Sequence, residues 1–129
     1  MSARLQHVAV TFPPGSDAAV RAFYGGALGL AEIEVPGEVA HLGWIWFATD
    51  EEGVELHFVP HPSAPDPERI HHFCLEVDDV KAARTRLEAG GASVRPAGSR
   101  IAGRERVFVR DPLGNLVELV RIGPDESPA

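Results

Sequence analysis

Four side chains able to bind a metal ion interrupt apolar stretches of this chain of 129 residues. His7, His57, His72 and Glu118 each stand in a short run of apolar or β-branched residues that is typical of a strand. A carboxylate in such a run is costly to bury unless it is paired or bound to a cation. Inward side chains of adjacent strands, about 4.8 Å apart, can share one ion at about 2.0–2.2 Å. The four residues therefore predict a site for a divalent transition metal.

The chemistry of such a site follows from its ligands. Three neutral imidazoles and one carboxylate leave one positive charge unneutralised, and an octahedral ion would keep two positions open. Those positions suit a bidentate oxygen ligand such as an enediolate or a catecholate. The metal would act as a Lewis acid that polarises a carbonyl and stabilises a developing oxyanion. Imidazole and carboxylate ligands suit Fe, Ni, Mn, Co or Zn, so the identity of the metal stays open.

The four residues fall at matching points of an internal repeat. Residues 5–10 resemble residues 70–75, which places His7 opposite His72. Residues 47–59 resemble residues 108–120, which places His57 opposite Glu118. The two matches differ in offset by four residues, and small changes in loop length account for that difference. The sequence therefore predicts two similar halves.

Hydrophobic patterning and turn residues predict the same order of elements in each half. The expected strands are 5–12, 31–35, 43–48 and 54–59 in the first half, and 71–77, 92–95, 105–110 and 115–121 in the second. Helices are expected from Ser16 or Asp17 to about residue 29, and from Asp78 or Asp79 to about residue 90. The fold class is thus α+β, with a βαβββ module at about 5–60, a proline-rich linker at about 60–69 and a second module at about 70–122. Residues 123–129 are expected to form a flexible tail.

Several of these segments resemble motifs of the vicinal oxygen chelate superfamily, which comprises glyoxalases, bleomycin-resistance proteins and ring-cleaving dioxygenases. The resemblance covers nearly all of residues 5–122 and rests on segments 5–8, 21–24, 28–30, 55–57, 72–80 and 111–119. It implies a single domain, spanning residues 1–122, in which the two modules curl their strands into one cup-shaped mixed sheet. It also implies that the first and last strands of each module hold a metal through His7, His57, His72 and Glu118. Many relatives are homodimers, some with modules exchanged so that each site draws on two chains, and the sequence does not choose between these arrangements.

Other residues are candidates for the substrate pocket. If Phe73 and Leu75 pack on a helix, His72 shares the cup face with Cys74, whereas a slip of one residue would place His71 there instead. The full set of pocket candidates is Thr11, Trp44, Trp46, Glu55 and Cys74. Three arginines before the penultimate strand are expected in a solvated loop: Arg100, Arg104 and Arg106.

The first functional hypothesis is a metal-dependent enzyme with lyase- or isomerase-like chemistry through a metal-stabilised enolate. Glu118 would be both a ligand and the catalytic base. His57 stands where glyoxalase I enzymes usually carry Glu or Gln, which disfavours a lactoylglutathione lyase and disfavours even more an epimerase with two opposed bases. The alternatives are an antibiotic- or small-molecule-sequestering protein of the bleomycin-resistance type, and an Fe(II) ring-cleaving dioxygenase.

Composition excludes other classes of function. The chain has 12 basic and 19 acidic residues, a net charge of −7, which argues against binding to nucleic acid or to an anionic membrane surface. Its single cysteine cannot form an internal disulfide, and the sequence shows neither a signal peptide nor a membrane-spanning run. We therefore expect a soluble cytoplasmic protein that binds a small-molecule substrate.

Overall fold

Eight strands form two four-stranded mixed sheets in the computed structural model, which describes residues 2–63 and 65–124. The first sheet has the order β1-β4-β3-β2 and the second the order β5-β8-β7-β6. The strands are β1 (His7–Phe12), β2 (Ala31–Ile33), β3 (Ile45–Ala48), β4 (Glu55–Pro60), β5 (His72–Glu76), β6 (Val94–Pro96), β7 (Arg104–Arg110) and β8 (Leu116–Ile122). The strands that come first and last along the chain in each half, β1 with β4 and β5 with β8, pair in parallel. The other pairs are antiparallel. The predicted duplication is therefore confirmed, with the strands divided between two sheets.

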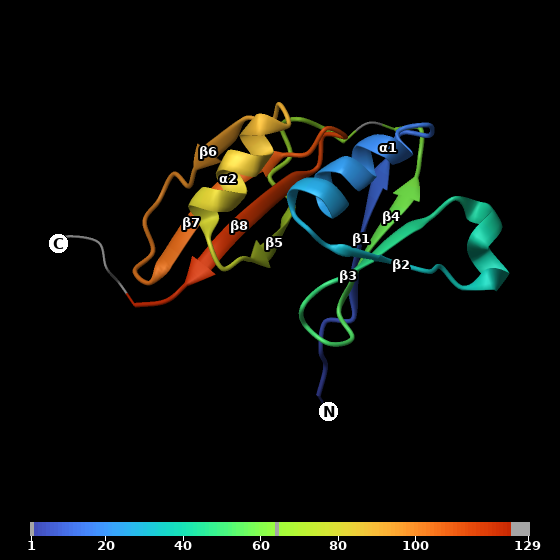
Figure 1. Cartoon of the computed structure of the whole chain (residues 1–129), viewed down its shortest axis with the longest axis horizontal. Helices are drawn as coiled ribbons and strands as arrows, with labels where there is room; N and C mark the ends of the chain where they lie inside the picture. The colour runs from blue at the N-terminus through green and yellow to red at the C-terminus, as the bar shows by residue number, and fades with distance from the viewer. Residues whose placement is uncertain (1, 64, 125–129) are drawn as a thin grey trace.

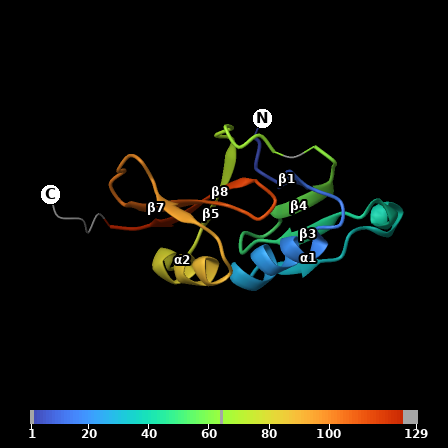
Figure 2. The same ribbon diagram turned by 90° about the horizontal axis from the view of Figure 1, so that it is seen from above.

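Both main helices lie on the same side of the two sheets (Figures 1 and 2). Helix α1 (Asp17–Val20) continues without a break into the π-helical segment η1 (Arg21–Ala27), and α2 (Val80–Ala89) follows β5. The connection between the halves crosses the opposite side of the sheets, which we call the helix-free face (Figure 2). No helix among the described residues is long and apolar enough to cross a membrane.

The observed element ends lie close to those expected from sequence. Asp79 caps α2 as predicted, because its carboxylate accepts a hydrogen bond from the backbone N–H of Ala82 at 3.0 Å. The 3₁₀ helix η2 (Gly37–Leu42) was not expected from sequence; it is bounded by Pro36 and by Gly43, which has the left-handed conformation at φ +76°. It has no buried residue, so no hydrophobic period marked it. Residues 125–129 of the expected tail lie outside the described residues.

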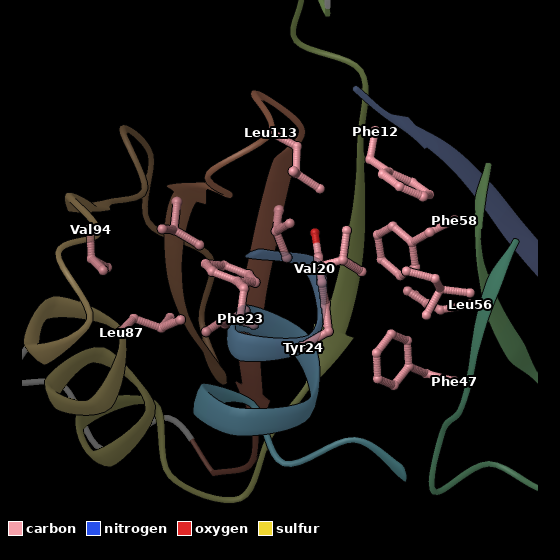
Figure 3. Close-up of a cluster of buried hydrophobic side chains, with 14 of the residues drawn as sticks. Phe12, Val20, Phe23, Tyr24, Phe47, Leu56, Phe58, Leu87, Val94 and Leu113 are labelled. Atoms are coloured by element: carbon pink, nitrogen blue, oxygen red, sulfur yellow. The ribbon is translucent and has the colours of Figure 1, made fainter. Parts of the chain in front are cut away.

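One hydrophobic core spans both halves (Figure 3). Strand residues that point toward the helices alternate with residues on the helix-free face, as the pleat requires. Val20, Phe23 and Tyr24, from α1 and η1, lie between the core residues of the two sheets (Figure 3). Phe58 of the first sheet and Leu119 of the second are both fully buried. The two halves are therefore held together by shared packing.

A buried hydrogen bond adds a polar link between the halves. The hydroxyl of Tyr24 donates to Oδ2 of Asp111 at 2.6 Å, and these residues are 0% and 4% exposed. Close by, Nδ2 of Asn115 donates to the carbonyl oxygen of Thr11 at 3.0 Å. These contacts tie η1 and β1 of the first half to the turn between β7 and β8.

Candidate metal centre

His7 and His57 lie side by side on the helix-free face of the first sheet. They come from the paired strands β1 and β4, and their rings stack with centroids 4.2 Å apart and planes at 17°. Nδ1 of His7 lies 2.6 Å from Oε1 of Gln6. An amide oxygen can only accept, so the imidazole donates through Nδ1–H and keeps its lone pair on Nε2. His7 is thus in the tautomer that a metal ligand binding through Nε2 requires.

His57 lies in a more crowded position. Its ring stacks on Trp46 of β3, with centroids 3.8 Å apart and planes at 3°, and its side chain is only 10% exposed. Nε2 of His57 lies 2.9 Å from Oε1 of Glu55, which accepts its proton. Trp44 extends the row of rings, 6.4 Å from Trp46. Trp46 and Glu55, both pocket candidates, therefore contact a predicted ligand directly.

His72 and Glu118 form a second pair on the helix-free face of the second sheet. Nδ1–H of His72 donates to the carbonyl oxygen of Ile70 at 2.9 Å, so Nε2 carries the lone pair in the neutral imidazole and a proton in the imidazolium. That nitrogen lies 2.9 Å from Oε1 of Glu118. Two acceptors at this distance repel each other unless a proton or a metal ion lies between them. Two ligands about 2.1 Å from one ion are themselves about 3 Å apart, so the pair has the spacing of neighbouring ligands.

Arg106 holds the other oxygen of Glu118. Its Nε donates to Oε2 at 3.0 Å, and the two side chains are 14% and 12% exposed. Burial alone would raise the pKa of Glu118, but the hydrogen bonds from Arg106 and His72 outweigh it and place that pKa below its ordinary value. The expectation of a solvated loop is wrong for Arg104 and Arg106, which both belong to β7. Arg104 is exposed there, whereas Arg106 contacts the candidate ligand. Sequence alone gave no sign of this contact, because it depends on the cross-strand register of β7 and β8.

Cys74 shares the helix-free face with His72, as expected from the inward packing of Phe73 and Leu75. The register thus selects His72 over His71 for this face. Burial, followed by the nearby carboxylate of Glu118, raises the pKa of the Cys74 thiol to about 11. The low thiolate fraction at neutral pH makes a nucleophilic role unfavourable.

We expect Cys74 to be alkylated slowly by iodoacetamide. At pH 8 the chelator-treated protein should react roughly 100-fold more slowly than a free cysteine of pKa about 8.5, because the thiolate is the reacting form. The rate, followed by mass spectrometry, should keep rising up to pH 10. A rate that levels off near pH 9 would contradict the raised pKa, and Glu118→Gln should accelerate the reaction.

A cavity of about 570 Å³ lies where β1, β5 and the connection between the halves meet. Of the predicted site residues, Thr11 and His72 line it, together with the rejected alternative His71. The other predicted residues, including Glu118, lie outside its lining. Its size is that of a small-molecule pocket, and it is a candidate entrance to the His72 pair.

The predicted ligands occur as two separate pairs. Within residues 2–63 and 65–124, no group of three or more His, Cys, Asp or Glu side chains is arranged to hold a metal ion. His7 and His57 belong to the first sheet, whereas His72 and Glu118 belong to the second. Each pair brings two possible metal ligands together. A four-ligand centre stays a prediction, and it requires a His7–His57 pair to lie against a His72–Glu118 pair.

Comparisons with known proteins place this chain in a family. Residues 4–119 match the model of the Glyoxalase/Bleomycin resistance protein/Dioxygenase superfamily. The chain is 34% identical over 137 residues to an ethylmalonyl-CoA/methylmalonyl-CoA epimerase of Cereibacter sphaeroides, a match that covers 95% of this chain and 100% of that protein.

Solved structures agree with this assignment. The fold is similar to that of a glyoxalase family protein from Bacillus anthracis, with a TM-score of 0.82 and 28% identity over 95% of this chain and 97% of that one. It is also similar to TnmS3, an antibiotic binding protein from Streptomyces sp. CB03234, with a TM-score of 0.69 and 23% identity over 95% and 98% of the two chains. The match over almost the whole sequence and the duplicated fold lead to one conclusion: this chain belongs to the Glyoxalase/Bleomycin resistance protein/Dioxygenase superfamily.

Proposed function

We propose that this protein is a divalent-metal-dependent enzyme that acts on a small oxygenated substrate by isomerase- or lyase-type chemistry. The observation that carries the proposal is the contact between His72 and Glu118. The hydrogen bond to Ile70 makes Nδ1 a donor, so in the neutral imidazole the lone pair of Nε2 faces Oε1 of Glu118 at 2.9 Å. A shared metal ion satisfies both acceptors, and the backbone carbonyl is the usual kind of partner for a metal-bound histidine.

The second pair of ligands would come from another copy of the chain. The two halves share one core and the buried Tyr24–Asp111 hydrogen bond, so they cannot rearrange within a chain without breaking it. A homodimer can instead bring His7 and His57 of one copy to His72 and Glu118 of the other. Such an arrangement is a closed, self-complementary interface, which is the commonest form of dimer.

The chemistry follows from the carboxylates on the helix-free face. When bound, the metal would polarise a substrate carbonyl and stabilise negative charge on its oxygen. Glu118 lies beside the proposed metal, and Glu55, 26% exposed at its side chain, lies beside His57. Because Oε2 of Glu118 is held by Arg106, Glu118 can exchange a proton only through Oε1 when that oxygen is released from the metal site. One of the two carboxylates would then remove a proton from the carbon next to the carbonyl while the other returns one. The expectation that disfavoured an epimerase treated Glu118 as the only base, whereas the likeness to an epimerase and the position of Glu55 now support that chemistry.

Elemental analysis of protein purified without a chelator or a histidine tag tests the metal. We expect about one transition-metal ion per chain, and a loss of most of it in Glu118→Ala, because that substitution removes one ligand and frees His72. Glu76→Ala is the matched control, since Glu76 is an exposed carboxylate on β5, the strand that pairs with the β8 strand of Glu118, and shares the face of His72. If the parent protein holds no metal and takes up none of Fe, Ni, Mn, Co or Zn, the proposal fails and His72–Glu118 is an ion pair.

The reaction class is tested by proton exchange. In D₂O, the metal-loaded protein should exchange the proton next to the thioester carbonyl of methylmalonyl-CoA for deuterium. The ¹H NMR signal of that proton should therefore disappear.

Iron in the purified protein would instead favour the ring-cleaving dioxygenase, which is tested by oxygen uptake with a catechol.

The row of stacked rings supports a second candidate, a protein that sequesters an aromatic small molecule. Trp44, just before β3, stacks in sequence with Trp46 of β3, His57 of β4 and His7 of β1. His7 at one end of the row is exposed and Trp44 at the other is half-buried, and a terminal ring of such a row can bind a planar ligand by stacking. Quenching of tryptophan fluorescence by planar antibiotics, in chelator-treated protein, measures this activity. Binding that persists without metal and is lost in Trp44→Ala would favour this candidate over the enzyme.

A further inference from the structure

Arg106 lies against a predicted ligand, Glu118. Its Nε donates to Oε2 of Glu118 at 3.0 Å, and its Nη1 donates to the carbonyl oxygen of Ser99 at 2.9 Å. The second bond anchors the guanidinium to the loop between β6 and β7. Because the side chain is only 14% exposed, this ion pair is better shielded from water than an ordinary surface pair.

Packing fixes the orientation of this group. The guanidinium carbon of Arg106 lies 5.9 Å from the centre of the Phe108 ring, and the same ring meets His72 edge-on at 5.1 Å. Phe108 is also the direct cross-strand partner of Glu118. The Phe108 ring therefore contacts both side chains that bind the Glu118 carboxylate. Each carboxylate oxygen has a different partner, His72 at Oε1 and Arg106 at Oε2.

We propose that Arg106 is a positioning residue that restricts Glu118 to metal binding through a single oxygen. The inference rests on the metal site proposed above. With Oε2 held by Arg106, only Oε1 is available beside Nε2 of His72. A carboxylate that bound through both oxygens would take a further coordination position. Arg106 thus preserves the pair of open positions that a substrate chelating through two oxygens needs.

The test uses the full-length protein loaded with Co²⁺, whose visible absorption reports coordination number and geometry. In Arg106→Met, which keeps length and removes the donors, Co²⁺ should remain bound in the parental stoichiometry with an altered visible spectrum. Oxalate, a small bidentate oxygen ligand, should bind on the order of tenfold more weakly than to the parent, because the freed oxygen competes for its position. Arg106→Lys, which keeps a cation near Oε2, should recover most of the oxalate affinity.

Arg104→Met is the matched control, because Arg104 precedes Arg106 by two residues on the same strand and is exposed. It should match the parent in spectrum and oxalate affinity, and circular dichroism should show all variants folded. An unchanged spectrum and oxalate affinity in Arg106→Met would overturn the inference, as would loss of Co²⁺ from that folded variant. Absence of Co²⁺ binding by the parent protein is a different result, since it refutes the proposed metal site itself.

Discussion

Replacing Asp111 with alanine is expected to lower the free energy of unfolding by about 3–5 kcal/mol. Asp111 is 4% exposed, and its carboxylate accepts from the hydroxyl of Tyr24, from the backbone N–H groups of Leu113 and Asn115, and from the Asn115 amide. Alanine would leave these donors in the protein interior without an acceptor, which costs far more than the same loss at the surface. A loss of this size is a large part of the about 5–15 kcal/mol that stabilises a typical domain.

Urea unfolding followed by circular dichroism measures this loss. Asp50→Ala is the matched control, because Asp50 opens the corresponding turn of the first half but is exposed. It should change the free energy of unfolding by no more than about 0.5 kcal/mol. If Asp111→Ala were equally mild, the Tyr24–Asp111 contact would not be the link that holds the halves together.

The loss of stability caused by removing the Tyr24 hydroxyl should depend on pH. Burial raises the pKa of Asp111 above its ordinary value, so the folded chain binds that proton more tightly than the unfolded chain does. Protonated Asp111 therefore contributes stability that is fully present below the unfolded pKa of about 3.9. This contribution is lost as pH rises through the folded pKa of Asp111. The Tyr24 hydroxyl offsets this loss, because its hydrogen bond favours the ionised carboxylate. Tyr24→Phe should therefore cost about 1.5–3 kcal/mol at pH 7 and clearly less at pH 4.

The fold could be predicted from sequence because each half carries the same local signals. The apolar alternation, the Asp79 cap and the turn beginning at Asp111 recur in chain order, and local hydrogen bonding and burial suffice to produce each element. The division into two sheets could not be predicted in the same way. It depends on whether β1 and β5 pair at their edges, and a strand edge carries no sequence signal for its partner.

The face on which the candidate ligands lie was predictable from sequence, and their contacts were not. His72 was correctly assigned to the helix-free face, because strand alternation and the inward Phe73 determine which side chains share a face. Arg106 and Glu118 lie 12 residues apart in sequence, and only the register of β7 against β8 brings them together. Similarly, the identity of Glu55 as the partner of His57 depends on side-chain rotamers within β4, which the residue pattern does not specify.

Complementation between two inactive variants tests how the ligand pairs meet. His7→Ala disables a pair on the first sheet, and Glu118→Ala disables a pair on the second. If a site combines His7 and His57 of one copy with His72 and Glu118 of the other, a dimer of the two variants contains one site with all four ligands and one site lacking two. Random pairing makes half the dimers mixed, so the co-refolded mixture should recover about a quarter of the parental metal content.

A second mixture makes this result specific to the geometry. His72→Ala and Glu118→Ala both alter the second sheet, so no combination of these two chains restores an intact pair there, and the mixture should hold no more metal than either variant alone. Recovery in the first mixture and not in the second requires ligands from two chains. Equal metal content in both mixtures would instead mean that one chain supplies the whole centre, and the shared core that holds the two halves in place would then have to open for the metal to bind.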